Sequence, residues 1–227
     1  MTGDRIDDAT TVPARIVVAD DDQIVRAGIA AILSSDDDIE IVAHAANGSE
    51  AIGAVDAHRP DVVLLDIQMP HLNGIDALRE IRRRRPDLPV AMLTTFSDDH
   101  LISDAIGSGA LGFLLKSDEP QQLISGVRAL ACGGGAFSPR VARWLASREQ
   151  AGHRAETSRR DLARTLSSRQ LEVLTHIGGG LSNAQIAASV HLSEGTVKQY
   201  VSQLFDEFGI DNRVQAAIIA FRNGLID

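Results

Sequence analysis

The 227-residue sequence predicts two domains: a doubly wound α/β domain of flavodoxin-like order, followed by a small all-α helix-turn-helix domain. Short apolar runs without polar alternation, each followed by a helical pattern, indicate parallel strands buried on both faces. A helix-start pattern that recurs three times towards the C-terminus indicates the second domain. The chain is long enough for both domains.

The first domain is expected to consist of five strand–helix units. The expected strands cover about 15–20, 39–45, 61–66, 89–95 and 111–116, and the expected helices cover about 23–34, 48–58, 74–85, 98–108 and 120–132. Right-handed crossovers, with helices on both faces, favour a sheet of order 2-1-3-4-5. We assign residues 14–132 to this domain and expect residues 1–13, which are polar, to form a disordered tail.

Polar residues end most of the expected strands. Asp66 ends the third strand, Asp20 and Asp21 follow the first, Thr94 ends the fourth, and Lys116 ends the fifth. Asp66 alone could simply cap a turn. Because the carboxyl ends of parallel strands meet at one sheet edge, however, we expect all five residues to converge. Such clustered carboxylates favour Mg²⁺, and a lysine opposite the metal suits a transferring phosphoryl group with Asp66 as nucleophile.

The same residues resemble the receiver domains of two-component response regulators over roughly residues 14–132. An acidic pair, an acceptor strand followed by MPxxxG, a strand-end threonine and the GFLLK lysine occur in the order typical of that family. The resemblance implies that Asp66 accepts a phosphoryl group from a sensor histidine kinase. It also implies that Asp21, Asp66 and the Gln68 backbone carbonyl bind Mg²⁺ directly, and that Asp20 binds it through water.

The resemblance assigns the remaining pocket residues as well. Thr94 and Lys116 are expected to hold the phosphoryl oxygens, and Phe113 resembles the aromatic residue that turns inward when Thr94 moves. An aspartyl-phosphate phosphohydrolase is an alternative reading of the same pocket. Gln68 argues against it, because such hydrolases use an acid two residues after the nucleophile.

Residues 133–160 are expected to form a linker that contains one helix. Ser138 and Pro139 supply a helix cap and a first helical residue. The stretch from Ser147 to Arg160 is charged and small, with little to bury.

Residues 161–227 carry the repeated helix-start pattern. In each case an apolar residue precedes a serine cap, and a second apolar residue lies five places after the first. The serines are Ser167, Ser182 and Ser193, and the first two also predict capping boxes with Gln170 and Gln185. Asp211 or Asn212 is expected to begin a fourth helix. Helices separated by tight turns are typical of the helix-turn-helix arrangement.

The helix expected over residues 194–208 has two distinct faces. Its apolar stripe contains Val197, Val201, Leu204 and Phe208, and its polar face contains Lys198, Gln199, Ser202 and Gln203. That polar face suits base edges and phosphates in a major groove, although a solvated surface helix would have the same pattern. Residues 162–227 resemble the LuxR-type output domains of the NarL/FixJ subfamily. The candidate DNA-binding residues are therefore Thr196, Lys198, Gln199, Ser202 and Gln203.

The expected DNA-binding domain is not basic. Residues 161–227 hold five Lys/Arg and seven Asp/Glu, a net charge of −2, whereas such domains usually carry a positive footprint. Tight binding is therefore expected to need two copies of the chain. If the final helix turns Val214, Ala217, Ile218 and Phe221 to its own core, an apolar strip remains for dimer contact, formed by Ala216, Ile219 and Ala220.

These observations predict a phosphorylation-dependent response regulator that binds double-stranded promoter DNA, forms a homodimer when phosphorylated and is not an enzyme. A regulator that acts through protein contacts without DNA is a further alternative. The single cysteine excludes an internal disulfide, and the sequence contains no apolar run long enough to span a bilayer. We therefore expect a cytoplasmic protein that does not enter a membrane.

Overall fold

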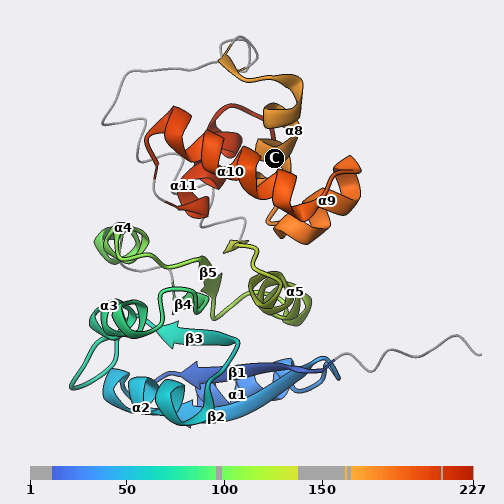
Figure 1. Ribbon diagram of the computed structural model, residues 1–227. Coiled ribbons are helices and arrows are strands. Elements are labelled where there is room, and N and C mark those ends of the chain that lie inside the picture. Colours follow the sequence, from blue (N-terminus) through green and yellow to red (C-terminus); the bar gives the residue numbers. More distant parts are fainter. Residues whose placement is uncertain (1–11, 96–98, 138–161, 163–164, 211, 227) are drawn as a thin grey trace, which may run out of the picture.

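The computed structural model describes residues 12–95, 99–137, 162, 165–210 and 212–226 (Figure 1). The predicted linker helix and most of the predicted N-terminal tail lie outside these residues. Two domains follow each other along the chain, an α/β domain and a helical domain, as the sequence predicts.

The first domain contains alternating strands and helices. Its strands are β1 (Ala14–Ala19), β2 (Ile39–Ala45), β3 (Val62–Asp66), β4 (Val90–Thr94), β5 (Gly112–Leu115) and β6 (Ala136–Phe137). Its helices are α1 (Gln23–Leu33), α2 (Gly48–His58), α3 (Gly74–Arg84), α4 (Asp99–Gly107) and α5 (Pro120–Ala131). The strands form one parallel sheet of order β2-β1-β3-β4-β5-β6, which confirms the predicted order 2-1-3-4-5.

The sixth strand extends this sheet beyond residue 132, where the sequence predicted the domain to end. Ala136 pairs with Gly112, and the Ala136 N–H donates to the carbonyl of Leu111 at 3.3 Å. A two-residue strand that directly follows a run of glycines is too short to show any hydrophobic period, so the sequence pattern could not reveal it.

Helices cover both faces of the sheet because alternate strand residues point to opposite sides. Ile16 and Val18 of β1 pack with helices α1 and α5, whereas Val17 and Ala19 pack with α2, α3 and α4. All four side chains are fully buried. The strands β3, β4 and β5 are buried along their whole length, so polar side chains reach the crevice from the strand ends.

The described residues of the second domain include four complete helices. They are α8 (Ser168–Gly178), α9 (Asn183–Val190), α10 (Glu194–Phe208) and α11 (Arg213–Arg222). The three predicted serine caps are confirmed, with capping boxes at Ser167 and Ser182, and Asn212 caps α11. His191 adopts a left-handed conformation (φ 54°) that ends α9 and produces the tight turn into α10.

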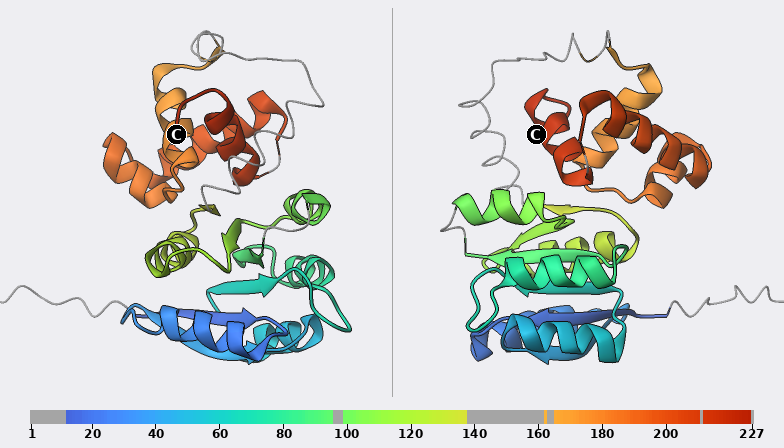
Figure 2. Two further views of the ribbon diagram at one scale, coloured as in Figure 1. Left: turned by 180° about the vertical axis from the view of Figure 1, so that it is seen from behind. Right: turned by 60° about the vertical axis from the view of Figure 1, so that its left-hand side comes forward.

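The helical domain lies against the β5–β6 edge of the sheet (Figures 1 and 2). Val214 and Ile218 of α11 pack in the hydrophobic cluster of the first domain, and Phe137 contacts the clusters of both domains. The backbones also come close, since a Cβ on Gly134 would lie 3.0 Å from the carbonyl oxygen of Gly180. A Cβ on Gly134 would also lie 2.8 Å from the carbonyl oxygen of Ala129, so a side chain there would force the backbone to shift.

Helix α11 does not pack as predicted, and the predicted apolar strip for dimer contact is wrong. Ala216 and Ala220 are 0% exposed and belong to the core of the helical domain, while Ile219 is half-buried. Val214 and Ile218, which were expected to fill that core, contact the first domain instead. The helix buries two faces, so its apolar residues do not divide into one buried face and one free face.

Candidate functional site

The phosphoryl-acceptor candidate, Asp66, is the last residue of β3 and is 5% exposed. The chain turns back at once, and the Gly74 N–H donates to the carbonyl of Ile67 at 2.9 Å. A Cβ on Gly74 would lie 1.9 Å from the carbonyl oxygen of Asp66, so no other residue fits there without moving the backbone. The predicted turn therefore fixes Asp66 at the sheet edge.

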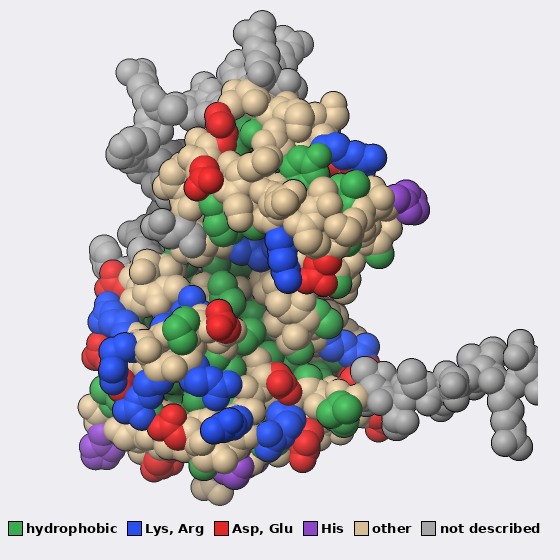
Figure 3. Space-filling view, in the orientation of Figure 1, with side chains coloured by type: hydrophobic (Ala, Val, Ile, Leu, Met, Phe, Trp, Pro, Cys, Tyr) green, Lys and Arg blue, Asp and Glu red, His purple; other side chains and the backbone are tan. Residues whose placement is uncertain are grey.

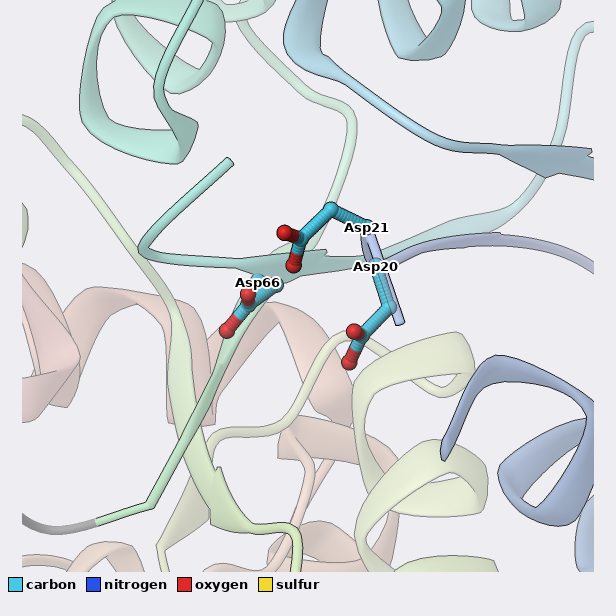
Figure 4. Close-up of side chains that lie close together, drawn as sticks. All are labelled: Asp20, Asp21 and Asp66. Atoms are coloured by element: carbon cyan, nitrogen blue, oxygen red, sulfur yellow. The ribbon is translucent and has the colours of Figure 1, made fainter. Parts of the chain in front are cut away.

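Three carboxylates meet at this edge (Figure 4). Asp20, Asp21 and Asp66 each offer an oxygen, and these oxygens lie within 4.8 Å of one another. Asp20 is 0% exposed and accepts a hydrogen bond from the Asp22 N–H at 3.0 Å, whereas Asp21 is exposed. Oxygen ligands with one side open to water are what a partly hydrated hard cation such as Mg²⁺ requires, so the cluster fits that ion.

Lys116 forms ion pairs with two of these candidate metal-binding carboxylates. Its Nζ is 2.7 Å from Asp20 Oδ2 and 3.0 Å from Asp66 Oδ1. Burial disfavours the ammonium, but the hydrogen bonds to Asp20 and Asp66 outweigh that effect and raise the pKa of Lys116. The lysine is therefore held in its charged form at the pocket.

The environment of Asp66 makes its ionisation costly. Burial is the largest cause and raises its pKa to about 6, Lys116 partly offsets the effect, and Asp20 and Asp21 add to it. A cation bound between these carboxylates would favour the ionised form, which is also the nucleophilic form.

The remaining predicted pocket residues lie close by. Thr94 is buried at the end of β4, and a cavity of about 260 Å³ is lined by Asp21, Asp66, Ile67, Gln68, Thr94, Thr95, Leu101 and Lys116. Thr95 also lines the pocket and was not predicted from the sequence, although it follows Thr94 directly. Phe113 is fully buried among side chains of the α2–α4 face. The five polar residues predicted to converge at this sheet edge thus do so.

Helix α10 presents the candidate DNA-binding residues. Lys198, Gln199, Ser202 and Gln203 are exposed, and Thr196 is half-buried with its Oγ1 2.8 Å from Ser193 Oγ. The opposite side is apolar, with Val197, Val201 and Leu204 buried and Phe208 half-buried. Lys198 Nζ lies 3.0 Å from Glu194 Oε1, in an exposed pair one helical turn apart.

The surface of the helical domain agrees with its low net charge. In the view of Figure 3 this domain shows mostly uncharged side chains, with a few basic and acidic groups between them. None of the helices in the described part of the chain has the length and apolar character that a bilayer-spanning segment needs.

Two protein families match this chain. Residues 16–128 match the response regulator receiver domain, and residues 164–220 match the bacterial regulatory proteins of the luxR family. LnrK, a transcriptional regulatory protein of Bacillus subtilis, is 35% identical over 216 residues, which cover 93% of this chain and 98% of the relative. DegU of Brevibacillus brevis is 33% identical over 223 residues, covering 93% of this chain and 94% of the relative.

Solved structures give the same assignment. The response regulator ChrA of a heme-sensing two-component system is 36% identical, with a TM-score of 0.53 over 94% of this chain and 99% of that one. A LuxR-family response regulator from Aurantimonas is 30% identical, with a TM-score of 0.58 over 61% of this chain and 99% of that one.

A receiver fold with its acidic pocket, followed by a helix-turn-helix domain, defines the class of two-component response regulators. This chain belongs to that family, with a receiver domain and a LuxR-type output domain, and its family regulates transcription.

Proposed function

We propose that this chain is a phosphorylation-dependent transcription factor, which accepts a phosphoryl group on Asp66 from a sensor histidine kinase and binds promoter DNA through α10. The convergence of Asp20, Asp21, Thr94 and Lys116 on Asp66 carries the proposal. Gln68 stands where a phosphohydrolase would need a second acid, so we favour a regulator over an enzyme.

In the proposed reaction an Asp66 carboxylate oxygen attacks the phosphorus of a phosphohistidine. A P–O bond forms as the P–N bond to the imidazole breaks, and the histidine leaves as the free side chain. The Lys116 ammonium and the Thr94 hydroxyl donate to the phosphoryl oxygens and stabilise their charge. Mg²⁺ held by Asp21, Asp66 and the Gln68 carbonyl, with Asp20 behind a water, would supply further charge neutralisation.

We propose that phosphorylation loosens the contact between the domains. Thr94, once drawn to a phosphoryl oxygen, would leave room for Phe113 to move. Phe113 lies in the same packed cluster as Val214 and Ile218 of the output helix α11. Cores repack between discrete arrangements more readily than they deform continuously, so a change at Phe113 can weaken the docking of α11.

The released output domain is proposed to bind DNA as a dimer. Its net charge of −2, with one lysine on α10, provides few phosphate contacts for a single copy. Two copies on one DNA double these contacts and make the second binding event effectively intramolecular. The expected operator is an inverted repeat with half-sites about one helical turn apart.

Phosphorylation by a small donor tests the first step. With acetyl phosphate and Mg²⁺, the full chain should gain an acid-stable, base-labile acyl phosphate, and the Asp66→Asn variant should not. Asp104→Asn, which changes an exposed acid beside the neighbouring cavity, is the matched control and should label normally. Labelling that persists in Asp66→Asn would contradict the assignment.

A further inference from the structure

Gln170 on α8 has an amide whose orientation is fixed by its capping box. The Ser167 backbone N–H donates to Gln170 Oε1 at 2.9 Å, and the Gln170 backbone N–H donates to Ser167 Oγ at 3.2 Å. A backbone N–H can only donate, so the amide atom that meets it must be the oxygen. The usual ambiguity between the two ends of a glutamine amide therefore does not arise here.

The other end of the Gln170 amide faces α10. Its Nε2 lies 3.3 Å from Oε1 of Gln203 on α10. Because an amide NH₂ has no acceptor to offer, the atom of Gln203 that meets it must also be an oxygen. The Gln203 amino group consequently points away from Gln170, on an exposed side chain of α10.

We infer that Gln170 is a positioning residue that makes Gln203 a hydrogen-bond donor to a DNA phosphate oxygen. The inference rests on the proposed DNA-binding function. Gln203 lies in the C-terminal half of α10 and beside α8, whereas the N-terminal residues of a recognition helix reach the base edges. Phosphate oxygens only accept hydrogen bonds, so a side chain held in the donor orientation suits them.

The Gln170→Glu substitution would reverse the direction of the hydrogen bond between the side chains of residues 170 and 203 without removing the helix cap. Glutamate forms the same capping box with serine, so the start of α8 is retained. The second oxygen of the new carboxylate can only accept, so Gln203 would turn its amino group to that carboxylate and present its oxygen to the DNA. An oxygen facing a phosphate repels it, and the donor contact is lost.

The test measures the affinity of the phosphorylated full chain for a selected operator. The proteins are the wild type, Gln170→Glu, Gln203→Ala and the double variant. Gln185→Glu is the matched control, because Gln185 forms the same type of capping box with Ser182 and the change adds the same charge. Thermal unfolding of each variant checks that the output domain is folded.

Gln170→Glu and Gln203→Ala should each weaken binding about three- to tenfold, as expected for one net hydrogen bond. In the Gln203→Ala background, Gln170→Glu should cost no more than Gln185→Glu costs in the wild type, because the residue being positioned is gone. If the wild type binds the operator and Gln170→Glu has the same affinity as Gln185→Glu, this inference alone is overturned. A wild type that binds no DNA would overturn the proposed function with it.

The same variants show whether the hydrogen-bond acceptor on the DNA is a phosphate oxygen or a base edge. Loss of a phosphate contact weakens binding to all DNA sequences about equally. If Gln203→Ala instead changed the preference at one base pair, the acceptor would be a base edge, and the phosphate assignment would be wrong.

Discussion

Ile218 of the output helix α11 packs in the same hydrophobic cluster as Phe113 of receiver strand β5. The next residue along the helix, Ile219, packs against the helical domain's own cluster. Of these two adjacent isoleucines, Ile218 therefore contacts the other domain and Ile219 packs within its own. Phe113 and the output domain thus share one hydrophobic cluster, through which the proposed coupling would act.

Ile218→Ser should loosen the docking of the output domain. We expect the unphosphorylated variant to bind a selected operator about fivefold or more tightly than the wild type, and to gain less on phosphorylation, since typical coupling energies are on the order of 1–3 kcal/mol. Fluorescence anisotropy with labelled DNA measures both affinities. Ile219→Ser is the control, and an equal effect from that variant would mean that docking is not what restrains binding.

Asp66→Asn should stabilise the metal-free protein at neutral pH. The pKa of Asp66 is raised to about 6 from an ordinary value of 3.8, so the folded chain binds more protons than the unfolded chain between these values. Its contribution to stability is therefore complete at low pH and is lost as the pH rises through about 6. Asparagine does not ionise, and the gain at pH 7 is at most about 3 kcal/mol.

Thermal unfolding in a chelator measures this effect. The difference between Asp66→Asn and the wild type should shrink as the pH falls from about 7 to about 4, and Mg²⁺ should stabilise the wild type more than the variant. Asp87→Asn, at an exposed aspartate, is the control and should show neither effect. A wild type that is at least as stable as Asp66→Asn at pH 7 in chelator would show that burial does not disfavour the carboxylate.

Glu194→Gln should tighten DNA binding. Glu194 pairs with Lys198 at 3.0 Å, and the pair is exposed, so it contributes little to folding. Removing the acid releases the lysine and takes a negative charge away from the side of α10 that is proposed to face DNA. Lys198→Ala should weaken binding and lower the salt slope by about 1.

Salt titrations of the operator affinity check these two variants. Glu207→Gln makes the same charge change near the other end of α10 and should have a smaller effect. An unchanged affinity in Lys198→Ala would remove this lysine from the DNA contacts.

The receiver pocket could be predicted from sequence because its main polar residues end strands. Asp66, Thr94 and Lys116 each lie at the end of an apolar run that indicates a buried strand. The parallel topology then brings the ends of these strands together. The serine caps were also predictable, since capping is decided within one turn of the chain.

Contacts between elements were not predictable in the same way. On α11, Val214 and Ile218 pack against the first domain, whereas Ala216 and Ala220 pack in the core of the helical domain. This arrangement depends on a second domain that covers the helix. Amphipathic patterning assumes a single buried face, so it cannot divide a helix that is buried on two. Gln170 was expected to form a capping box with the cap residue Ser167, but its contact with Gln203 appears only when α8 and α10 are packed together.

The most direct test of phosphorylation-dependent DNA binding is the operator affinity of the full chain before and after treatment with acetyl phosphate and Mg²⁺, measured in parallel for Asp66→Asn. Phosphorylation should tighten binding of the wild type about fivefold or more, the lower end of typical coupling between sites, and should leave Asp66→Asn unchanged. Equal affinity of the phosphorylated and unphosphorylated wild type, or the same gain in Asp66→Asn, would contradict phosphorylation-dependent binding through Asp66.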